Sequence, residues 1–275
     1  MRVIESLNWP GKGAGTGDDR FGYDEAAGTA WVMDGATDVG PFRVFDREES
    51  DAAWVAQALT NLLIASPPGK EGGGPYFERI LEDLRKTAQK KSRVELSTAP
   101  PSTWPIAAGM WLHAKQDTVE CAWLGDCVAL IQRTDGSVEV ITTVYEDDLE
   151  TKTSRRLNTL SPEERQKGLQ DIRAKQNTDA KWAVFGLHPE AHRNLKTCVL
   201  QKSDCANVVL MTDGFWRLVE LYKLMSPGEL MERALSEGLE ALARDLREFE
   251  KGEDVDASAR IKRADDACAL LIALD

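Results

Sequence analysis

The sequence predicts an α+β fold in which two antiparallel sheets pack face to face and helices cover their outer faces. Two apolar runs flank Asp135-Gly136, a strong signal for a hairpin turn, and a hairpin joins antiparallel strands. Amphipathic helices occur early and late in the chain, and each needs a sheet face to cover. On these patterns alone, other α+β arrangements of the same elements stay open.

The predicted elements of the first half are a strand, two helices and a meander of strands. The strand covers Thr29–Asp34. Apolar residues recur at helical spacing in Ser50–Ser66 and in Pro75–Lys91, which begins with proline at the first helical position. The meander comprises Ile106–Ala114, Thr118–Asp126, Cys127–Arg133 and Ser137–Thr143.

The second half begins with a polar, mostly helical segment at about 146–179, in which Ser161 opens a helix with a capping box. The segment has no strong apolar stripe, so we expect it to cross the surface and to be among the least stable parts of the fold. A buried strand, one long helix and a last strand follow at Asn207–Asp213, Ser226–Phe249 and Ala267–Leu274. We interpret residues 1–275 as one domain that carries this polar segment.

Composition and charge argue against several classes of function. The chain of 275 residues has a net charge of −12, which disfavours nucleic acid as a partner because nucleic-acid affinity comes largely from Lys and Arg. The apolar run Ala267–Leu274 is too short to cross a bilayer, and the first residues lack the apolar stretch of a secretory signal. Five scattered cysteines without a C-x-x-C pair fit reduced thiols, so we expect a cytoplasmic protein.

Acidic residues stand next to the apolar strands at distant points of the chain. Asp34-Gly35 follows one strand and Asp213-Gly214 another, and the other acids of this kind are Asp18, Asp19, Asp126, Asp265 and Asp266. A carboxylate at a sheet edge is costly to desolvate unless it is paired or bound to a metal, and basic residues are sparse nearby in the sequence. If the strand ends meet, divalent cations would balance the charge, and all-oxygen ligands suit Mg²⁺ or Mn²⁺.

Taken in order, these motifs resemble those of the metal-dependent PP2C-type (PPM) serine/threonine protein phosphatases. The matching stretches are GDDRFG, WVMDGAT, WLGDCVALI, VVLMTDGFW and DDACALLIAL, and they span Gly17–Leu274. Each motif alone is weak because Asp-Gly is a common pair, but five in order, each beside a strand, are a much stronger signal. The resemblance implies a four-layer α/β/β/α sandwich, which agrees with the fold predicted from the element pattern.

The resemblance also implies a role for each matching acid. Asp34 would bridge two Mg²⁺ or Mn²⁺ ions, and the Gly35 carbonyl would bind one of them. Asp213 and Asp265 would complete the shell of the other ion. Asp19, with Asp18 in the place of the family's Glu, would hold the second metal directly or through water. Asp126 matches an aspartate that helps to hold a third, weaker ion.

The same resemblance implies the chemistry. Water activated by the two ions, rather than a side chain, would attack the phosphorus, so that Asp34 and Asp213 would be catalytic through the metal-bound water. The family's phosphate-binding Arg is Ala14 here, and Lys12 is the nearest cation, so we expect Lys12 to contact the phosphate. Other departures from the family pattern are Gly17 for Asn, Asp18 for Glu, Cys127 for Ser, Thr212 for Ser and Asp266 for Asn.

We therefore predict a phosphatase that hydrolyses phosphoserine and phosphothreonine in proteins. The segment at about 146–179 stands where the family carries its variable flap, so the resemblance implies that this segment selects the protein substrate. The partners of the phosphatase would be phosphorylated proteins, among them a serine/threonine kinase or the targets of one, and it would act as a monomer without nucleic acid or membrane. The alternative is a weak or inactive pseudophosphatase that uses the same fold for binding or regulation. A haloacid-dehalogenase-type phosphatase is excluded by spacing, because Ala36 stands where that chemistry needs a second Asp.

Overall fold

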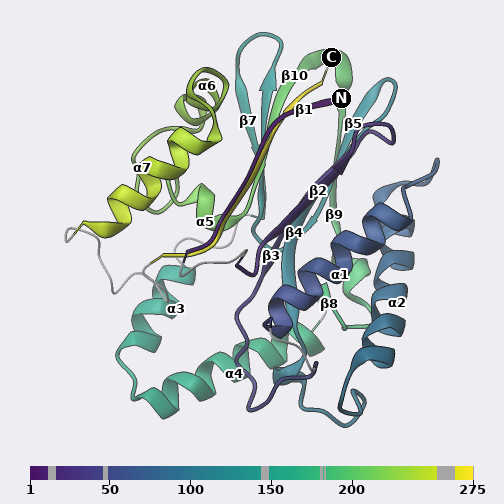
Figure 1. Ribbon diagram of the computed structural model, residues 1–275, viewed down its shortest axis with the longest axis vertical. Helices are drawn as coiled ribbons and strands as arrows, with labels where there is room; N and C mark the ends of the chain where they lie inside the picture. Colours follow the sequence, from purple (N-terminus) through teal and green to yellow (C-terminus); the bar gives the residue numbers. More distant parts are fainter. Residues whose placement is uncertain are drawn as a thin grey trace.

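The computed structural model describes residues 1–11, 17–45, 49–143, 149–179, 182, 184–252 and 264–274 of the chain. In these residues two antiparallel sheets lie face to face, with one pair of helices outside each sheet (Figure 1). The predicted α+β class and its four-layer α/β/β/α arrangement are confirmed.

The first sheet has the strand order β1-β11-β10-β6-β7. Its strands are β1 Arg2–Trp9, β11 Ala267–Ala273, β10 Cys205–Met211, β6 Val128–Arg133 and β7 Val138–Ile141. The second sheet has the order β2-β3-β4-β5-β9, and the short β8 pairs with β4. Its strands are β2 Arg20–Asp24, β3 Thr29–Gly35, β4 Ile106–Ala114, β5 Thr118–Leu124, β8 Phe185–Gly186 and β9 Lys196–Gln201. The first and last strands of the chain are thus neighbours in one sheet.

Helices cover both outer faces and one end of the sandwich. Helices α1 (Asp51–Ala65) and α2 (Gly73–Lys91) lie on the second sheet, and α6 (Pro227–Glu237) and α7 (Leu239–Lys251) lie on the first (Figure 1). Helices α3 (Leu149–Asn158) and α4 (Pro162–Thr178) lie at the lower end of Figure 1. A helix of one turn, α5 (Asp213–Trp216), follows β10.

The hydrophobic core has one layer at each of the three junctions. Val32, Met110, Ile131 and Leu270 are among the residues buried between the sheets. Aromatic side chains fill the layer under α1 and α2, including Trp31, Tyr76, Phe77 and Trp111. Leucines of α6 and α7 pack on the outer face of the first sheet with Val209 and Leu271. Each amphipathic helix therefore covers a sheet face, as its apolar stripe predicts.

Three predictions about elements are wrong in detail. The expected single helix at Ser226–Phe249 is two helices, because Gly238 adopts φ +86°, a conformation that breaks the helix and that only glycine adopts without strain. Helix α2 begins at Gly73, two residues before the expected Pro75. Asp213 does not end a strand; it is the first residue of α5. Strands β1 and β9 were not predicted at all.

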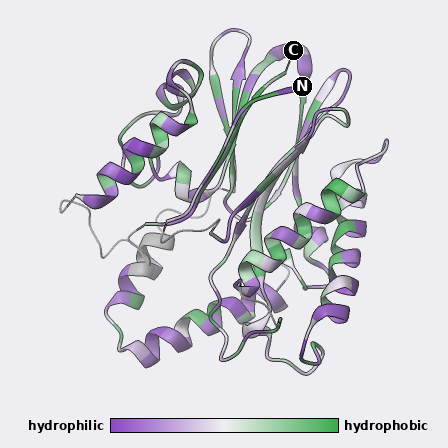
Figure 2. Ribbon diagram, viewed as in Figure 1, coloured by the Kyte–Doolittle hydropathy of each residue, from purple (hydrophilic) through white to green (hydrophobic). Residues whose placement is uncertain are grey.

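The polar segment is held to the sandwich by side-chain hydrogen bonds to backbone carbonyls. Arg173 of α4 is buried and donates to the carbonyls of Ala36 and Thr37, just after Asp34-Gly35, and burial lowers its pKa to about 10. Asn177 donates to the carbonyls of Pro101 and Trp104. Figure 2 shows that hydrophilic residues recur along α4, whereas the strands carry long hydrophobic stretches. The contacts that Arg173 and Asn177 make with the sandwich are therefore polar. Low stability of the segment stays a prediction.

Candidate active site

Acidic residues from both sheets gather at one end of the sandwich. Asp34 is the last residue but one of β3, whereas Asp213 follows β10 and Asp265 precedes β11 in the opposite sheet. Asp19 precedes β2. The charges of Asp213 and Asp265 act on both Asp19 and Asp34, and the charge of Asp126 acts on Asp34. The structure thus brings together the acids that the sequence places in separate motifs.

This gathering is electrostatically unfavourable for the protein alone. Burial is the largest cause that raises the pKa of Asp19 and of Asp34, and the charges of neighbouring carboxylates raise both pKa values further. Asp19 is only 2 % exposed. A buried cluster of like charges is stable only if a cation or protons offset the repulsion.

A hydroxyl group holds the Asp19 carboxylate. The fully buried Thr212 donates its Oγ1 hydrogen to Asp19 Oδ2 at 2.8 Å, and this contact partly counteracts the rise in the Asp19 pKa. The amide of Cys268 in turn donates to Thr212 Oγ1 at 3.0 Å. Asp19, just before β2 of the second sheet, is thereby tied to the ends of β10 and β11 in the first sheet.

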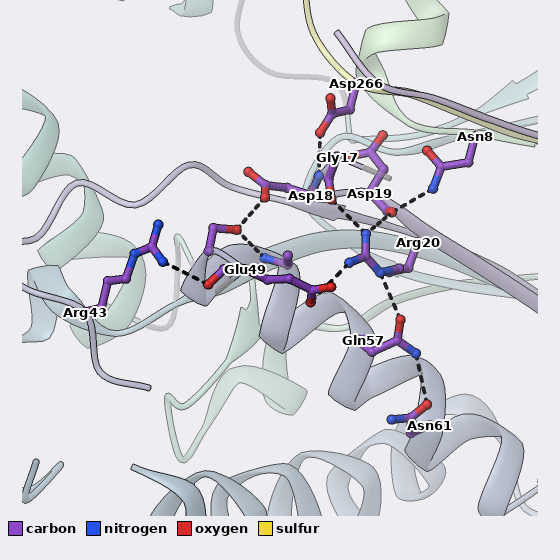
Figure 3. A network of polar contacts seen from close by, with 12 residues as sticks. Asn8, Gly17, Asp18, Asp19, Arg20, Arg43, Glu49, Gln57, Asn61 and Asp266 are labelled. Atoms are coloured by element: carbon purple, nitrogen blue, oxygen red, sulfur yellow. Dashed lines mark hydrogen bonds and ion pairs between the residues drawn. The ribbon is translucent and has the colours of Figure 1, made fainter. Parts of the chain in front are cut away.

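Arg20 fixes the backbone around Asp19, as Figure 3 shows. Its buried guanidinium donates to the carbonyls of Gly17 (2.9 Å) and Asp19 (2.7 Å) and to Gln57 Oε1 of α1 (2.9 Å). The Asn8 side chain donates to the same Asp19 carbonyl at 3.0 Å. Arg20 therefore positions the segment 17–20, and its charge is also paired with the Glu49 carboxylate at 3.7 Å.

Asp18 and Asp266 make different contacts from Asp19. The Asp18 carboxylate accepts a hydrogen bond from the Ser50 hydroxyl, at the N-cap of α1 (Figure 3). The Asp266 carboxylate accepts from the amide of Gly11 at 2.8 Å and from the amide of Asp18 at 2.5 Å. Asp266 thus joins the end of β1 to the segment before β2.

Glycines allow the backbone to approach closely around the cluster. A Cβ on Gly35 would lie 2.7 Å from the Asp18 carbonyl oxygen, and a Cβ on Gly214 would lie 1.9 Å from the Asp266 carbonyl oxygen. Contacts this short force the chain to move. Gly35 and Gly214 are therefore needed for the close packing of these segments.

We predict that Gly214→Ala destabilises the protein by about 1–3 kcal/mol, because the new methyl group overlaps the backbone before β11. Gly228→Ala is a matched control, since a Cβ there meets nothing within 4 Å. Urea unfolding of both variants in EDTA measures the effect. Equal stability of the two variants would contradict the close packing of Gly214 against Asp266.

Asp126 and Lys12 are the two remaining predicted site residues, and the structure describes only Asp126. Asp126 lies close enough for its charge to act on Asp34 and on the Cys127 thiol. Lys12 lies outside the described residues, so its contact with phosphate stays a prediction. All five cysteines are free, and burial and the nearby carboxylates raise the pKa of Cys127, which keeps this thiol neutral.

One charged residue of the cluster was missed by the sequence analysis. Arg217 is buried, and its Nη2 donates to Asp265 Oδ2 at 2.8 Å. Its backbone N–H donates to the Asp213 carbonyl at 3.0 Å, so Arg217 lies one helical turn after Asp213. The sequence DGFWR places Arg217 four residues after Asp213. This spacing predicts that Arg217 lies near the acidic cluster only if a helix, and not the end of a strand, is expected at Asp213.

The donor chemistry of the cluster fits a hard divalent cation. Carboxylates from both sheets supply oxygen atoms only, and their mutual repulsion is the charge that such a cation offsets. Within the part of the chain that the structure describes, no three His, Cys, Asp or Glu side chains are already arranged as a finished metal-binding group.

Comparison with known proteins identifies the family to which this fold and acidic site belong. The family model described as "Protein phosphatase 2C" matches residues 16–249. The chain is therefore a member of the protein phosphatase 2C family, a family of protein-serine/threonine phosphatases. The matched range contains every predicted site residue except Lys12 and Asp265. No curated protein sequence is similar enough to the chain to count as a match.

Several solved bacterial phosphatases share the fold. A bacterial serine phosphatase has a TM-score of 0.55 at 13% identity, over 100% of this chain and 98% of that one. The serine/threonine phosphatase Stp1 from Staphylococcus aureus gives a TM-score of 0.55 at 13% identity, with coverage of 100% and 96%. The catalytic domain of serine threonine protein phosphatase PstP in complex with two manganese ions gives 0.54 at 15% identity, with coverage of 97% and 95%. At such low identity these likenesses concern the fold alone.

Among the described residues, no helix combines the length and the apolar character needed to cross a membrane.

Proposed function

We propose that the chain is a metal-dependent phosphatase that hydrolyses phosphoserine and phosphothreonine in proteins. The observation that carries this proposal is the mutual action of Asp19, Asp34, Asp213 and Asp265, which come from both sheets and repel one another at one end of the sandwich. A protein keeps such a costly arrangement where a cation is to be bound. Family membership and the manganese complex of the similarly folded PstP support the same conclusion.

Asp34, the Gly35 carbonyl, Asp213, Asp265 and Asp19 would hold two Mg²⁺ or Mn²⁺ ions, with Asp126 as a ligand of a third, weaker one. When bound, such ions lower the pKa of water and offset the negative charge of a phosphate group. Asp18 is a further candidate ligand, although the Ser50 hydroxyl donates to its carboxylate here.

The other side chains of the site hold the ligands in place and take no part in nucleophilic attack. Thr212 orients the Asp19 carboxylate, and Arg20 and Asn8 fix the Asp19 backbone. The Cys127 thiol stays protonated and is a poor nucleophile. In the proposed reaction water attacks phosphorus and the bond from phosphorus to the serine or threonine oxygen breaks. The leaving oxygen takes up a proton that the water gives up, so the products are the free hydroxyl side chain and inorganic phosphate.

The substrate class gives the partners that this function requires. A protein-serine/threonine kinase must supply the phosphorylated protein, and either the kinase itself or its targets would be the substrate. Helices α3 and α4 would contact the protein substrate, since Arg173 joins α4 to the loop directly after Asp34-Gly35. The expectation that nucleic acid is not a partner rests on the charge of −12, and the expectation of a cytoplasmic protein rests on the scattered cysteines. Action as a monomer stays a prediction.

A comparison of phosphopeptides tests this substrate assignment. Matched peptides that carry phosphoserine, phosphothreonine or phosphotyrosine in one sequence are incubated with the protein and Mn²⁺, and released phosphate is measured. We expect hydrolysis of the first two and little of the third. Preference for the phosphotyrosine peptide would contradict the proposed specificity.

We predict that Lys12→Ala raises KM for phosphopeptides about ten-fold, the effect of losing one charge-assisted contact, and changes kcat much less. The family's arginine is absent at Ala14, and a lysine is a point charge that cannot grip phosphate with two parallel hydrogen bonds. Steady-state kinetics of Lys12→Ala and Lys12→Arg measure the effect. Unchanged constants in both variants would mean that the phosphate is held by another cation.

In the pseudophosphatase alternative the protein has the same fold but does not hydrolyse phosphate esters. The departures at Ala14 and Gly17 favour it, and the presence of the acidic set argues against it. Binding of a phosphoprotein without release of phosphate, at any Mn²⁺ concentration, would establish this alternative.

A further inference from the structure

Both oxygens of the Asp265 carboxylate already have hydrogen-bond donors within the protein. Arg217 Nη2 donates to Oδ2 at 2.8 Å, and the Asp266 amide donates to Oδ1 at 3.1 Å. The Arg217 and Asp265 side chains are only 9% and 20% exposed, so water screens this ion pair weakly. The pair therefore belongs to the interior of the site.

Helix α5 places the Arg217 side chain next to Asp265. Helix α5 begins at Asp213, and the N–H of Arg217 donates to the Asp213 carbonyl, which fixes Arg217 relative to a second acid of the cluster. The Asp265 backbone has its own anchor, because Arg247 donates to the Asp265 carbonyl at 2.7 Å. Loss of the Arg217 contact would thus remove one donor from the Asp265 carboxylate and leave the Asp265 backbone anchored.

We propose that Arg217 is an internal counterion that holds Asp265 while the site lacks a metal ion and competes with a divalent cation for that carboxylate. The inference rests on the proposed function, since it concerns the affinity of the same metal site. It assigns to Arg217 a role in setting how much Mg²⁺ or Mn²⁺ is needed to fill the site.

The physical argument is one of charge. A guanidinium group stays protonated at any pH at which the protein is folded, so Arg217 cannot leave the pair by losing its charge. A divalent ion at Asp265 and the guanidinium on the same carboxylate repel each other, most strongly where burial limits screening. Metal binding must therefore loosen or break the contact between Arg217 and Asp265, and this lowers the affinity.

The contact between Arg217 and Asp265 has a second interpretation, which predicts that removal of Arg217 lowers the metal affinity. A hydrogen-bond donor behind a ligand carboxylate can orient it, and removal of such a donor weakens metal binding. The variant Arg217→Gln distinguishes the counterion role from the orienting role, because it keeps an N–H donor and removes the charge. Arg217→Met removes both, and Arg217→Lys keeps the charge.

Mn²⁺ binding measured by isothermal titration calorimetry, without any substrate, tests the proposal. We expect Arg217→Gln and Arg217→Met to bind Mn²⁺ about ten-fold more tightly than the wild type, the change that loss of one charge-assisted contact gives, and Arg217→Lys to stay near the wild type. Arg233→Gln is the matched control, because Arg233 forms ion pairs with Glu237 and Asp245 on α6 and α7, outside the acidic cluster. Its Mn²⁺ affinity should equal that of the wild type.

The outcomes separate this inference from the proposed function. If the wild type binds Mn²⁺ and the Gln and Met variants bind equally or more weakly, the counterion role is wrong and the metal site stands. If neither the wild type nor any variant binds Mn²⁺, both fail.

A measurement on the wild type covers the case in which the variants do not fold. The guanidinium NMR signal of Arg217 should show restricted rotation in EDTA, as expected of an ion-paired arginine, and should become mobile when Mg²⁺ saturates the site. A signal that stays restricted at saturating Mg²⁺ would overturn the proposal.

Discussion

Asp34→Asn and Asp213→Asn are each expected to lower Mn²⁺-dependent turnover by at least about a hundredfold, the effect of losing one preorganised electrostatic group in other active sites. Each substitution keeps the shape of the side chain and removes a negative charge that no neighbour replaces. Both positions lie at the end of the sandwich where the acids of the two sheets meet. The fold should survive, because neither carboxylate is the main support of a strand.

Steady-state hydrolysis of a phosphothreonine peptide across a range of Mn²⁺ concentrations measures this loss, and thermal unfolding checks the fold. Asp83→Asn is the control, since Asp83 lies on the solvent-facing side of α2 beside Lys86. Wild-type turnover in either Asp34→Asn or Asp213→Asn would show that the metal ligands have been assigned to the wrong residues.

Asp19→Asn is expected to stabilise the metal-free protein by about 2 kcal/mol at pH 8, although it weakens metal binding. The Asp19 carboxylate is buried among other carboxylates, which raises its pKa. An uncompensated buried charge costs several kcal/mol, and the hydrogen bond from Thr212 offsets part of that cost. An amide in the same place carries no charge and keeps a hydrogen-bonding oxygen.

The sign of the pH dependence follows from the raised pKa. Between the ordinary pKa of Asp and the higher pKa in the folded state, the folded protein holds a proton that the unfolded chain has lost. The stability of the wild type in EDTA therefore falls as the pH rises through this window and levels off above the folded pKa. Asparagine does not titrate, so the advantage of Asp19→Asn should grow over the same window and vanish in acid.

Urea unfolding in EDTA at several pH values, repeated with saturating Mn²⁺, measures this difference. Mn²⁺ should reverse the order of stability, because a ligand that binds only the folded state stabilises it and the wild type binds it better. A less stable Asp19→Asn protein in EDTA at pH 8 would contradict the idea that the buried carboxylate is a cost in the absence of metal.

Sequence periodicity predicts the parts of the fold whose signal is local. The strand Ile106–Ala114 was predicted with the bounds that it has, because a continuous apolar run marks a buried strand. Strand β9 was missed since it is a short edge strand with exposed residues such as Val199. Strand β1 was missed because the pairs Val3-Ile4 and Glu5-Ser6 interrupt the alternation of apolar and polar residues that marks a half-buried strand. Such edge strands are specified by their neighbours more than by their own composition.

The acids of the candidate site could be named from the sequence because each stands beside a strand in a recognisable motif, and their role as metal ligands stays a prediction. The sequence does not show which hydrogen-bond partner each of these acids has in the folded protein. Asp266 holds the amides of Gly11 and Asp18, residues about 250 positions away in the sequence. Arg217 reaches Asp265 only because α5 begins at Asp213, just after β10, and because β11, which follows Asp265, pairs with β10. Contacts of this kind depend on the folded chain and leave no local pattern.

Release of phosphate from a phosphothreonine peptide, measured in EDTA and then with added Mn²⁺, tests the central claim most directly. The account predicts no hydrolysis in EDTA, hydrolysis that rises with Mn²⁺ until the site is saturated, and full recovery when excess Mn²⁺ follows the chelator. Hydrolysis that continues unchanged in EDTA would contradict the metal-dependent mechanism, and the absence of hydrolysis at every Mn²⁺ concentration would show that the chain is a pseudophosphatase.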